Sequence, residues 1–318
     1  MSASHSVPQS APQKRHIQRP LYLAKETLMG LLFMHRYRFL TIAQFARVSG
    51  FSLPHSREVL RDLHARGALG YTGYFPLPGT GGRAPKVYFL KRKGFLYLTE
   101  EGGLDPQLLG EFHEAGMEPA WSPQMTHRLC LLDLMISLET AVQSQPHLQL
   151  IETFLEYRRA RGTKQRETAD YVCEPDRPEN RIVPDGAFVL ENFKTGRRGL
   201  FFLEMDMGTE RIAVTRGSRD LRATVYGKLV QYDTYLTSGR FAKTYEALGD
   251  FRFATVLIVT TAKERIDNIR VAAVGLSDPL HRYYRLTEYQ EALRDFLGPV
   301  WNSRSPADPA KHALTAQS

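Results

Sequence analysis

Apolar residues recur at helical spacing along the first patterned stretch of the chain. They predict a first helix over residues 21–35. A second begins at Thr41, whose side chain suits a helix N-cap, and ends at Gly50, a residue suited to the left-handed backbone of a helix end. A third covers residues 54–66, with Pro54 in its first turn. Short helices joined by a tight turn predict a helix-turn-helix.

Two alternating segments follow and predict a β-hairpin. They are ALGYTGYF (residues 68–75) and KVYFL (residues 86–90), and the tip between them is rich in Gly and Pro. A helix-turn-helix followed by such a hairpin is typical of a winged helix, which we predict over residues 21–100. Residues 1–20 are rich in Ser, Pro and Gln and are predicted to be disordered.

The pattern changes again after a predicted linker at residues 101–122. Residues 123–300 are predicted to form an α/β domain with a central mixed sheet, in the order helix, three strands, helix, strand. In its first helix, His127 shares a stripe with apolar residues and could face either core or site; an ordinary packing role is favoured for it. Residues 301–318 are dominated by Pro, Ala and Ser and are predicted to be a disordered tail.

Charge is distributed unevenly between these regions. Residues 1–99 hold fifteen Lys or Arg against three Asp or Glu, whereas residues 100–318 hold 27 against 31. Because phosphate neutralisation supplies much of the affinity for DNA, this asymmetry indicates a DNA-binding N-terminal domain. We expect a homodimer on double-stranded DNA, because winged-helix proteins often read paired half-sites. The chain has no apolar run long enough for a membrane span and no signal-peptide core, so a cytoplasmic protein is expected.

The third helix and the hairpin contain the candidate DNA contacts. The front of the helix can reach base edges and phosphates, and Arg83 at the hairpin tip is expected to enter the minor groove. Taken singly, each of these residues is an ordinary solvated side chain, and the interpretation depends on their occurring together. The predicted contacts are His55, Ser56, Arg57, Arg61, Arg83 and Lys86.

Carboxylates in two apolar segments are the candidate chemistry of the second domain. In FFLEMDMGTE, period-two geometry places Phe202, Glu204 and Asp206 on one face of a strand. Burying unpaired carboxylates is costly, so neighbouring acids in a core strand indicate a metal, a shared proton or a cationic partner. Asp185, in VPDGAFVL, completes an oxygen set suited to Mg²⁺ or Mn²⁺, although Pro-Asp-Gly is also an ordinary turn. The predicted metal ligands are Asp185, Glu204 and Asp206.

The helix predicted after this strand adds further polar groups. Lys228, Gln231 and Tyr235 lie on one stripe beside an apolar one. Lys228 could lean over the carboxylates and stabilise charge on a phosphate, while Gln231 and Tyr235 could hold the strand or the lysine. An amphipathic helix with a solvated edge explains each residue about as well.

The order of these segments resembles a known fold and a known family. Pro184-Asp185, Glu204-Met205-Asp206, Lys228 and the Gln231 to Tyr235 motif resemble the PD-(D/E)XK nucleases with a QxxxY-type motif. A winged helix followed by HRLCLLDL, VPDGAFVL, FLEMDMGTE and KLVQYDTYL is similar to the replication-relaxation family over roughly residues 22–260. The resemblance implies a role in replication or relaxation of plasmid and mobile-element DNA. The chain departs from the nuclease pattern at Asp206, which stands where such nucleases have Lys. Lys228, on the following helix, could take the place of that lysine.

Two function classes remain open on these residues, and a third is weaker. In the first, the protein is a divalent-metal-dependent endonuclease or nickase, with Asp185, Glu204, Lys228, Gln231 and Tyr235 at its catalytic site. In the second, it is a non-catalytic replication or transcription regulator with a degenerate nuclease-like dimerisation domain. In the third, a relaxase links to DNA through Tyr232 or Tyr235, which is disfavoured because the chain lacks a histidine pair with HxH spacing.

Overall fold

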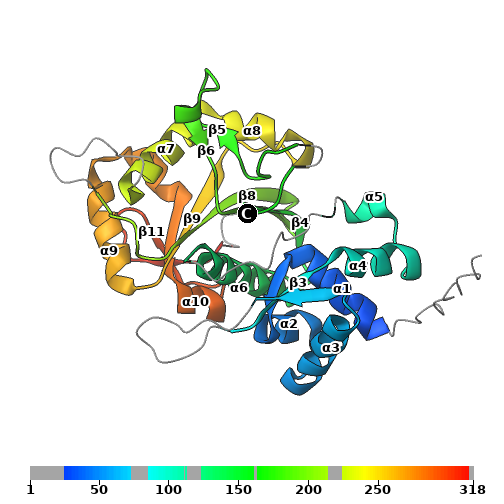
Figure 1. Cartoon of the computed structure of the whole chain (residues 1–318). Helices are drawn as coiled ribbons and strands as arrows, with labels where there is room; N and C mark the ends of the chain where they lie inside the picture. Colours follow the sequence, from blue (N-terminus) through cyan, green and yellow to red (C-terminus); the bar gives the residue numbers. More distant parts are fainter. Residues whose placement is uncertain are drawn as a thin grey trace, which may run out of the picture.

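A computed structural model describes residues 25–72, 85–110, 112, 123–160, 163–213 and 224–314. It is a mixed α/β structure built around a seven-stranded sheet, with the N-terminal helices gathered beside helix α6 (Figure 1). In the described part of the chain, no helix has the length and apolar character that crossing a membrane requires.

The elements run along the chain as follows. The helices are α1 (Lys25–Tyr37), α2 (Ile42–Ser49), α3 (Leu53–Ala65), α4 (Arg92–Leu96), α5 (Pro106–Leu109), α6 (Pro123–Gln143), α7 (Val225–Ser238), α8 (Arg240–Thr244), α9 (Lys263–Ala272) and α10 (Tyr289–Arg294). The strands are β1 (Phe39–Thr41), β2 (Leu69–Tyr71), β3 (Val87–Leu90), β4 (Leu148–Leu155), β5 (Asp170–Tyr171), β6 (Arg181–Ile182), β7 (Gly186–Asn192), β8 (Arg197–Asp206), β9 (Ala254–Thr260), β10 (Tyr284–Glu288), β11 (Trp301–Ser303) and β12 (Lys311–His312).

Residues 25–101, here called the N-terminal unit, begin with three helices whose ends follow from the sequence. Thr41 and Gln44 form a capping box: Gln44 N–H donates to Thr41 Oγ1 at 3.2 Å, and Thr41 N–H donates to Gln44 Oε1 at 3.0 Å. Gly50 ends α2 with a φ of 71°. The predicted start and end of the second helix are therefore confirmed.

The N-terminal unit also contains a small antiparallel sheet in the order β1-β3-β2. Strands β2 and β3 pair as the predicted hairpin, with Leu69 opposite Leu90. Strand β1, which pairs with β3, was not predicted, because three residues are too few to show a period. The hairpin tip at residues 73–84, with Arg83, lies outside the described residues.

The large sheet has the order β12-β11-β10-β9-β8-β7-β4. Strands β8, β9 and β10 are parallel to one another, whereas the remaining neighbours pair antiparallel. The elements α6, β4, β7, β8, α7 and β9 occur in the predicted order, and the prediction of a central mixed sheet is confirmed.

Alternation along β8 divides its side chains between two cores. Phe201, Leu203 and Met205 pack in the core shared with α6, while Leu200 and Phe202 pack in the core shared with α7 and α9. Glu204, two residues after Phe202, therefore faces α7.

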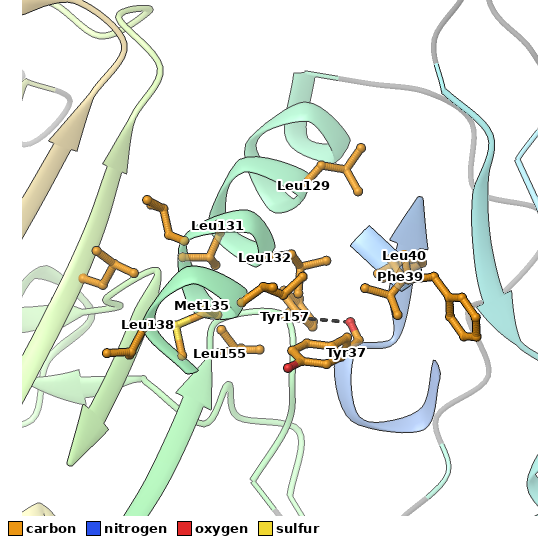
Figure 2. Close-up of a cluster of buried hydrophobic side chains, with 14 of the residues drawn as sticks. Tyr37, Phe39, Leu40, Leu129, Leu131, Leu132, Met135, Leu138, Leu155 and Tyr157 are labelled. Carbon is orange, nitrogen blue, oxygen red and sulfur yellow. Dashed lines mark hydrogen bonds between the residues drawn. The ribbon is translucent and has the colours of Figure 1, made fainter. Parts of the chain in front are cut away.

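Helix α6 joins the N-terminal unit to the sheet. Apolar side chains of Tyr37, Phe39 and Leu40 belong to the same buried cluster as those of α6, as Figure 2 shows. Tyr157, just after β4, donates its hydroxyl to the Tyr37 carbonyl at 3.2 Å, and Gln44 Nε2 donates to the Leu129 carbonyl at 2.9 Å. The two regions thus share one core, while half of the predicted linker, residues 111 and 113–122, lies outside the described residues.

The prediction of a disordered tail is wrong for residues 301–314. Trp301 is fully buried in β11 and donates its indole N–H to the Phe296 carbonyl at 2.8 Å. Arg304 is also fully buried, and its Nη1 lies 2.6 Å from Asp233 Oδ1 on α7. The Pro- and Ala-rich composition of the segment suggested disorder, but a few fully buried residues such as Trp301 and Arg304 order it.

The buried tail gives a stability prediction. Trp301→Ala should lower the free energy of unfolding by about 3–5 kcal/mol, because it leaves a large cavity in the core. Urea denaturation followed by circular dichroism measures this loss. Ala307→Ser, at an exposed position of the same segment, should leave the transition unchanged. Equal stability of both variants and the wild type would contradict the packing of this segment.

Candidate carboxylate centre

Pairing of β7 with β8 brings two of the predicted carboxylates together. Gly186 at the start of β7 lies opposite Leu203 of β8, so the preceding residue, Asp185, falls beside Glu204. The centre lies where β8 ends, between the second turn of α6 and the first turns of α7. The register of one strand pair therefore assembles residues that are nineteen positions apart.

Asp185 is held by the backbone of β8 and by a histidine of α6. Its Oδ2 accepts the Met205 N–H at 2.8 Å and lies 3.0 Å from His127 Nε2. The same Nε2 lies 3.1 Å from the Met205 carbonyl oxygen. Because a carbonyl only accepts, His127 must carry its hydrogen on Nε2.

His127 is a site residue to which the sequence analysis gave an ordinary packing role. Leu131, one helical turn after His127, packs close to Gly186: a Cβ atom added to that glycine would stand 3.7 Å from it. His127 lies on the same face of α6 and therefore reaches Asp185, the residue before Gly186. Burial lowers the pKa of His127, but the hydrogen bond and the charge of Asp185 outweigh it, and the pKa is raised overall. The centre thus favours a cationic imidazole.

Glu204 is a buried carboxylate of the centre, with 7% of its surface exposed. Tyr232 donates its hydroxyl to Oε1 at 2.6 Å, and Lys228 Nζ lies 3.4 Å from Oε2. Burial and the nearby charge of Asp185 raise the pKa of Glu204 to about 7, against the opposing influence of Lys228 and Tyr232. Glu204 therefore titrates near neutral pH.

Lys228 reaches the carboxylates as expected. Thr224 caps α7 by accepting the Gly227 N–H at 3.0 Å, which fixes the first turns of the helix. Lys228 Nζ then lies 3.2 Å from Glu210 Oε1 in addition to its contact with Glu204. Burial lowers the pKa of Lys228, but the surrounding carboxylates outweigh it, and the pKa is raised overall.

Asp206 is bound to an arginine of α9. Arg265 donates to Asp206 through Nε and through Nη2, the latter at 2.8 Å, and the Gly208 N–H donates to Oδ1 at 2.9 Å. Asp206, Glu204 and Lys228 line a cavity of only about 20 Å³, space for at most a single water molecule. Asp206 would have to leave Arg265 before it could hold a cation.

The predicted three-carboxylate metal set is therefore not assembled in this arrangement. Within the described ranges, no three His, Cys, Asp or Glu side chains are grouped so that they could hold a metal ion. Asp185 and Glu204 lie beside each other across the β7–β8 pair, and each already has hydrogen-bond donors or a cationic side chain as a partner.

The remaining predicted catalytic residues, Gln231 and Tyr235, both lie on α7 but have different surroundings. Gln231 is half-buried on α7. Tyr235 donates its hydroxyl to Asp170 of β5 instead of reaching Glu204, which Tyr232 contacts. Burial is the largest cause that raises the pKa of both tyrosines, which makes them poor nucleophiles for a covalent link to DNA.

The predicted DNA contacts on α3 divide by burial. His55, Arg57 and Arg61 are exposed, whereas Ser56 is fully buried and its hydroxyl has no hydrogen-bond partner among the described residues. The prediction for Ser56 is therefore wrong: it lies four and seven residues before Leu60 and Leu63, on the buried stripe of the helix. Lys86 places its ammonium 3.5 Å from the ring centre of Tyr71.

The geometry defines a mixed α/β protein with paired carboxylates and a lysine at the end of a central strand. A family model for replication-relaxation matches residues 31–250, more than half of the chain, and the protein belongs to this family. Searches of curated proteins and of solved structures found no match. The family indicates a role in replication or relaxation of plasmid or mobile-element DNA.

The raised pKa of Glu204 predicts how stability depends on pH. Between 4.5, the ordinary pKa, and about 7, the folded protein holds a proton that the unfolded chain has released. The wild type should therefore lose stability as the pH rises through this window, by an amount on the order of 3 kcal/mol. Glu204→Gln cannot titrate, so its unfolding free energy should fall less over the same window.

Urea denaturation in the presence of a chelator, at several pH values within the window, measures this difference. Glu179→Gln removes an exposed carboxylate from another segment and should follow the wild-type profile. Parallel pH profiles for wild type and Glu204→Gln would show that Glu204 keeps an ordinary pKa.

Proposed function

We propose that the protein binds double-stranded DNA of a plasmid or mobile element through a winged helix-turn-helix formed by the N-terminal unit, and acts in replication or relaxation of that DNA. The observation that carries the proposal is the cationic face of α3. Arg57 and Arg61 are exposed on this helix, which lies on the side of α2 away from α6 and the large sheet (Figure 1).

The surroundings of α3 support this assignment. Helix α2 binds α6 through Arg47, whose Nη1 lies 3.0 Å from Asp133 Oδ1, so α2 faces the protein and α3 is left to face a partner. The region before residue 100 carries the basic excess of the chain. Exposed arginines on a helix of a basic unit suit phosphate and base-edge contacts.

Replacing the exposed arginines should weaken duplex binding. Arg57→Ala and Arg61→Ala should each reduce affinity for duplex DNA by about tenfold and reduce the slope of log affinity against log salt by about one unit. Fluorescence anisotropy with a labelled duplex at several salt concentrations measures both quantities.

Ser56→Ala is the matched control on the same helix. Its hydroxyl is buried and unpartnered, so the variant should bind the duplex like the wild type. Wild-type affinity and salt slope in both arginine variants would exclude α3 as the DNA-binding helix.

A second candidate function is supported by the carboxylate centre. We propose that the α/β region is PD-(D/E)XK-like and cleaves or nicks DNA with Mg²⁺ or Mn²⁺ held by Asp185 and Glu204. The observation in its favour is that Asp185, just before β7, Glu204 of β8 and Lys228 of α7 lie together although they are far apart in the sequence. A bound divalent ion would supply a Lewis acid for phosphodiester hydrolysis.

The residues of the chain have separable tasks in this proposal. His127 and the Met205 N–H fix the orientation of Asp185, and Tyr232 fixes that of Glu204. Lys228 carries a positive charge beside them, suited to a phosphate oxygen. Asp206, held by Arg265, orders the strand end and is not assigned to the ion.

Nicking of supercoiled plasmid tests this second candidate. The wild type should convert supercoiled to open-circular DNA when Mg²⁺ or Mn²⁺ is added, and Glu204→Gln should abolish conversion while retaining duplex binding. Glu179→Gln, which removes an exposed carboxylate elsewhere, should cleave like the wild type. Absence of nicking with either ion would favour the alternative, a non-catalytic DNA-binding regulator with a degenerate nuclease-like domain.

A further inference from the structure

A basic cavity lies between the N-terminal unit and the segment that follows β4. Its volume is about 520 Å³. Four guanidinium groups line it, and among the described lining residues Glu167 alone carries a negative charge; the arginines are Arg36, Arg38, Arg158 and Arg159. None of these residues belongs to α3 or to the carboxylate centre.

Two of the four arginines have carboxylate partners and two do not. Arg36 lies 2.8 Å from Glu139, and Arg158 lies 3.3 Å from Glu167. Arg38 and Arg159 form no ion pair with any described carboxylate. Arg38 donates Nη1 to the Tyr157 carbonyl at 2.8 Å, and its buried Nε has no partner within the described ranges. Among its described lining residues, the cavity therefore has an excess of positive charge.

Arg38 has a backbone conformation that is costly for a residue with a side chain. Arg38 follows the end of α1 with a φ of 65°, a left-handed conformation that costs a residue other than glycine about 1–2 kcal/mol. Burial lowers the pKa of Arg38, and the charges of Arg128 and Arg159 lower it further. Crowded guanidinium groups in a half-buried place are relieved by an anion.

The rest of the lining narrows the chemistry of that anion. Phe33, Leu109 and Phe112 contribute apolar surface beside the arginines. Guanidinium groups suit phosphate oxygens, and aromatic rings beside a cationic groove suit nucleobases. The cavity has the size of a small-ligand site, much smaller than a DNA duplex. We propose that it binds a nucleotide unit, with the phosphate on Arg38 and Arg159 and the base against the apolar wall.

The position of the cavity relates it to the carboxylate centre. The Glu156 N–H donates to the Asp185 carbonyl at 2.9 Å, and Arg158 follows Glu156 by two residues. Arg128, which crowds Arg38, directly follows His127. A single DNA strand seated in the cavity would continue toward the carboxylates, and a free nucleotide would fill the cavity alone.

Binding of single-stranded oligothymidine to the full-length protein tests the proposal. Fluorescence anisotropy with a labelled oligonucleotide should show binding that falls about tenfold in Arg159→Ala and in Arg38→Gly, because each loses a charged hydrogen-bond donor to phosphate. Glycine at position 38 suits the left-handed backbone, and Arg159 is exposed, so folding should be preserved. Competition by free dTMP identifies a nucleotide site, whereas lack of competition identifies a site for single-stranded DNA.

Arg177→Ala, which removes an exposed arginine far along the chain, controls for the loss of net charge and should bind oligothymidine like the wild type. The proposal is independent of duplex binding: Arg57→Ala should weaken duplex binding alone, and Arg159→Ala should weaken oligothymidine binding alone. Absence of oligothymidine and dTMP binding by the wild type, or equal binding by wild type, Arg159→Ala and Arg38→Gly, would overturn it.

Discussion

The architecture depends on one helix that packs on both sides. Helix α6 buries Leu131 and Leu138 in a core that also contains Phe188 and Leu203 of the sheet, and its neighbouring residues Leu129 and Leu132 join the N-terminal unit to the same core. A helix that is apolar over most of its surface is one that lies between layers. Because α6 is held from both sides, its N-terminal turns are fixed in place. The second of these turns carries His127 to Asp185 and Arg128 to the neighbourhood of Arg38.

The carboxylate centre is stable because each acid has a separate partner. Asp185 has the His127 imidazole and a backbone N–H, Glu204 has Lys228 and a tyrosine hydroxyl, and Asp206 has the fork of Arg265. A buried carboxylate without such partners would cost several kcal/mol. The pairing also distinguishes the three acids: Asp206 lines the same small cavity as Glu204, but its carboxylate is held by the fork of Arg265, whereas Asp185 is held by His127 and the backbone of β8. Period-two spacing alone made Glu204 and Asp206 look equivalent.

What the sequence could predict follows from how local each feature is. The capping box at Thr41, the glycine at position 50 and the alternation of β8 are set by neighbouring residues, and all were predictable. The burial of Ser56 was also within reach, since it shares a stripe with Leu60 and Leu63. The sequence could not show that Tyr232, and not Tyr235, contacts Glu204, because the two tyrosines lie one helical turn apart and are equally plausible. Arg265 reaches Asp206 through tertiary packing, which no local period reports, and for His127 the period indicated the face of α6 but not the partner, Asp185.

The carboxylate centre also depends on residues outside the family match, which ends at residue 250. Strand β9 begins after that point and pairs along β8 from Leu200 to Asp206, so it supports the strand that carries Glu204. Arg304, just after β11, binds Asp233, and Tyr284 of β10 donates its hydroxyl to the same carboxylate at 2.6 Å. Asp233 lies on α7, the helix of Lys228. The C-terminal strands therefore hold in position the helix whose lysine faces Glu204, and the centre recognised by the family pattern depends on a segment outside it.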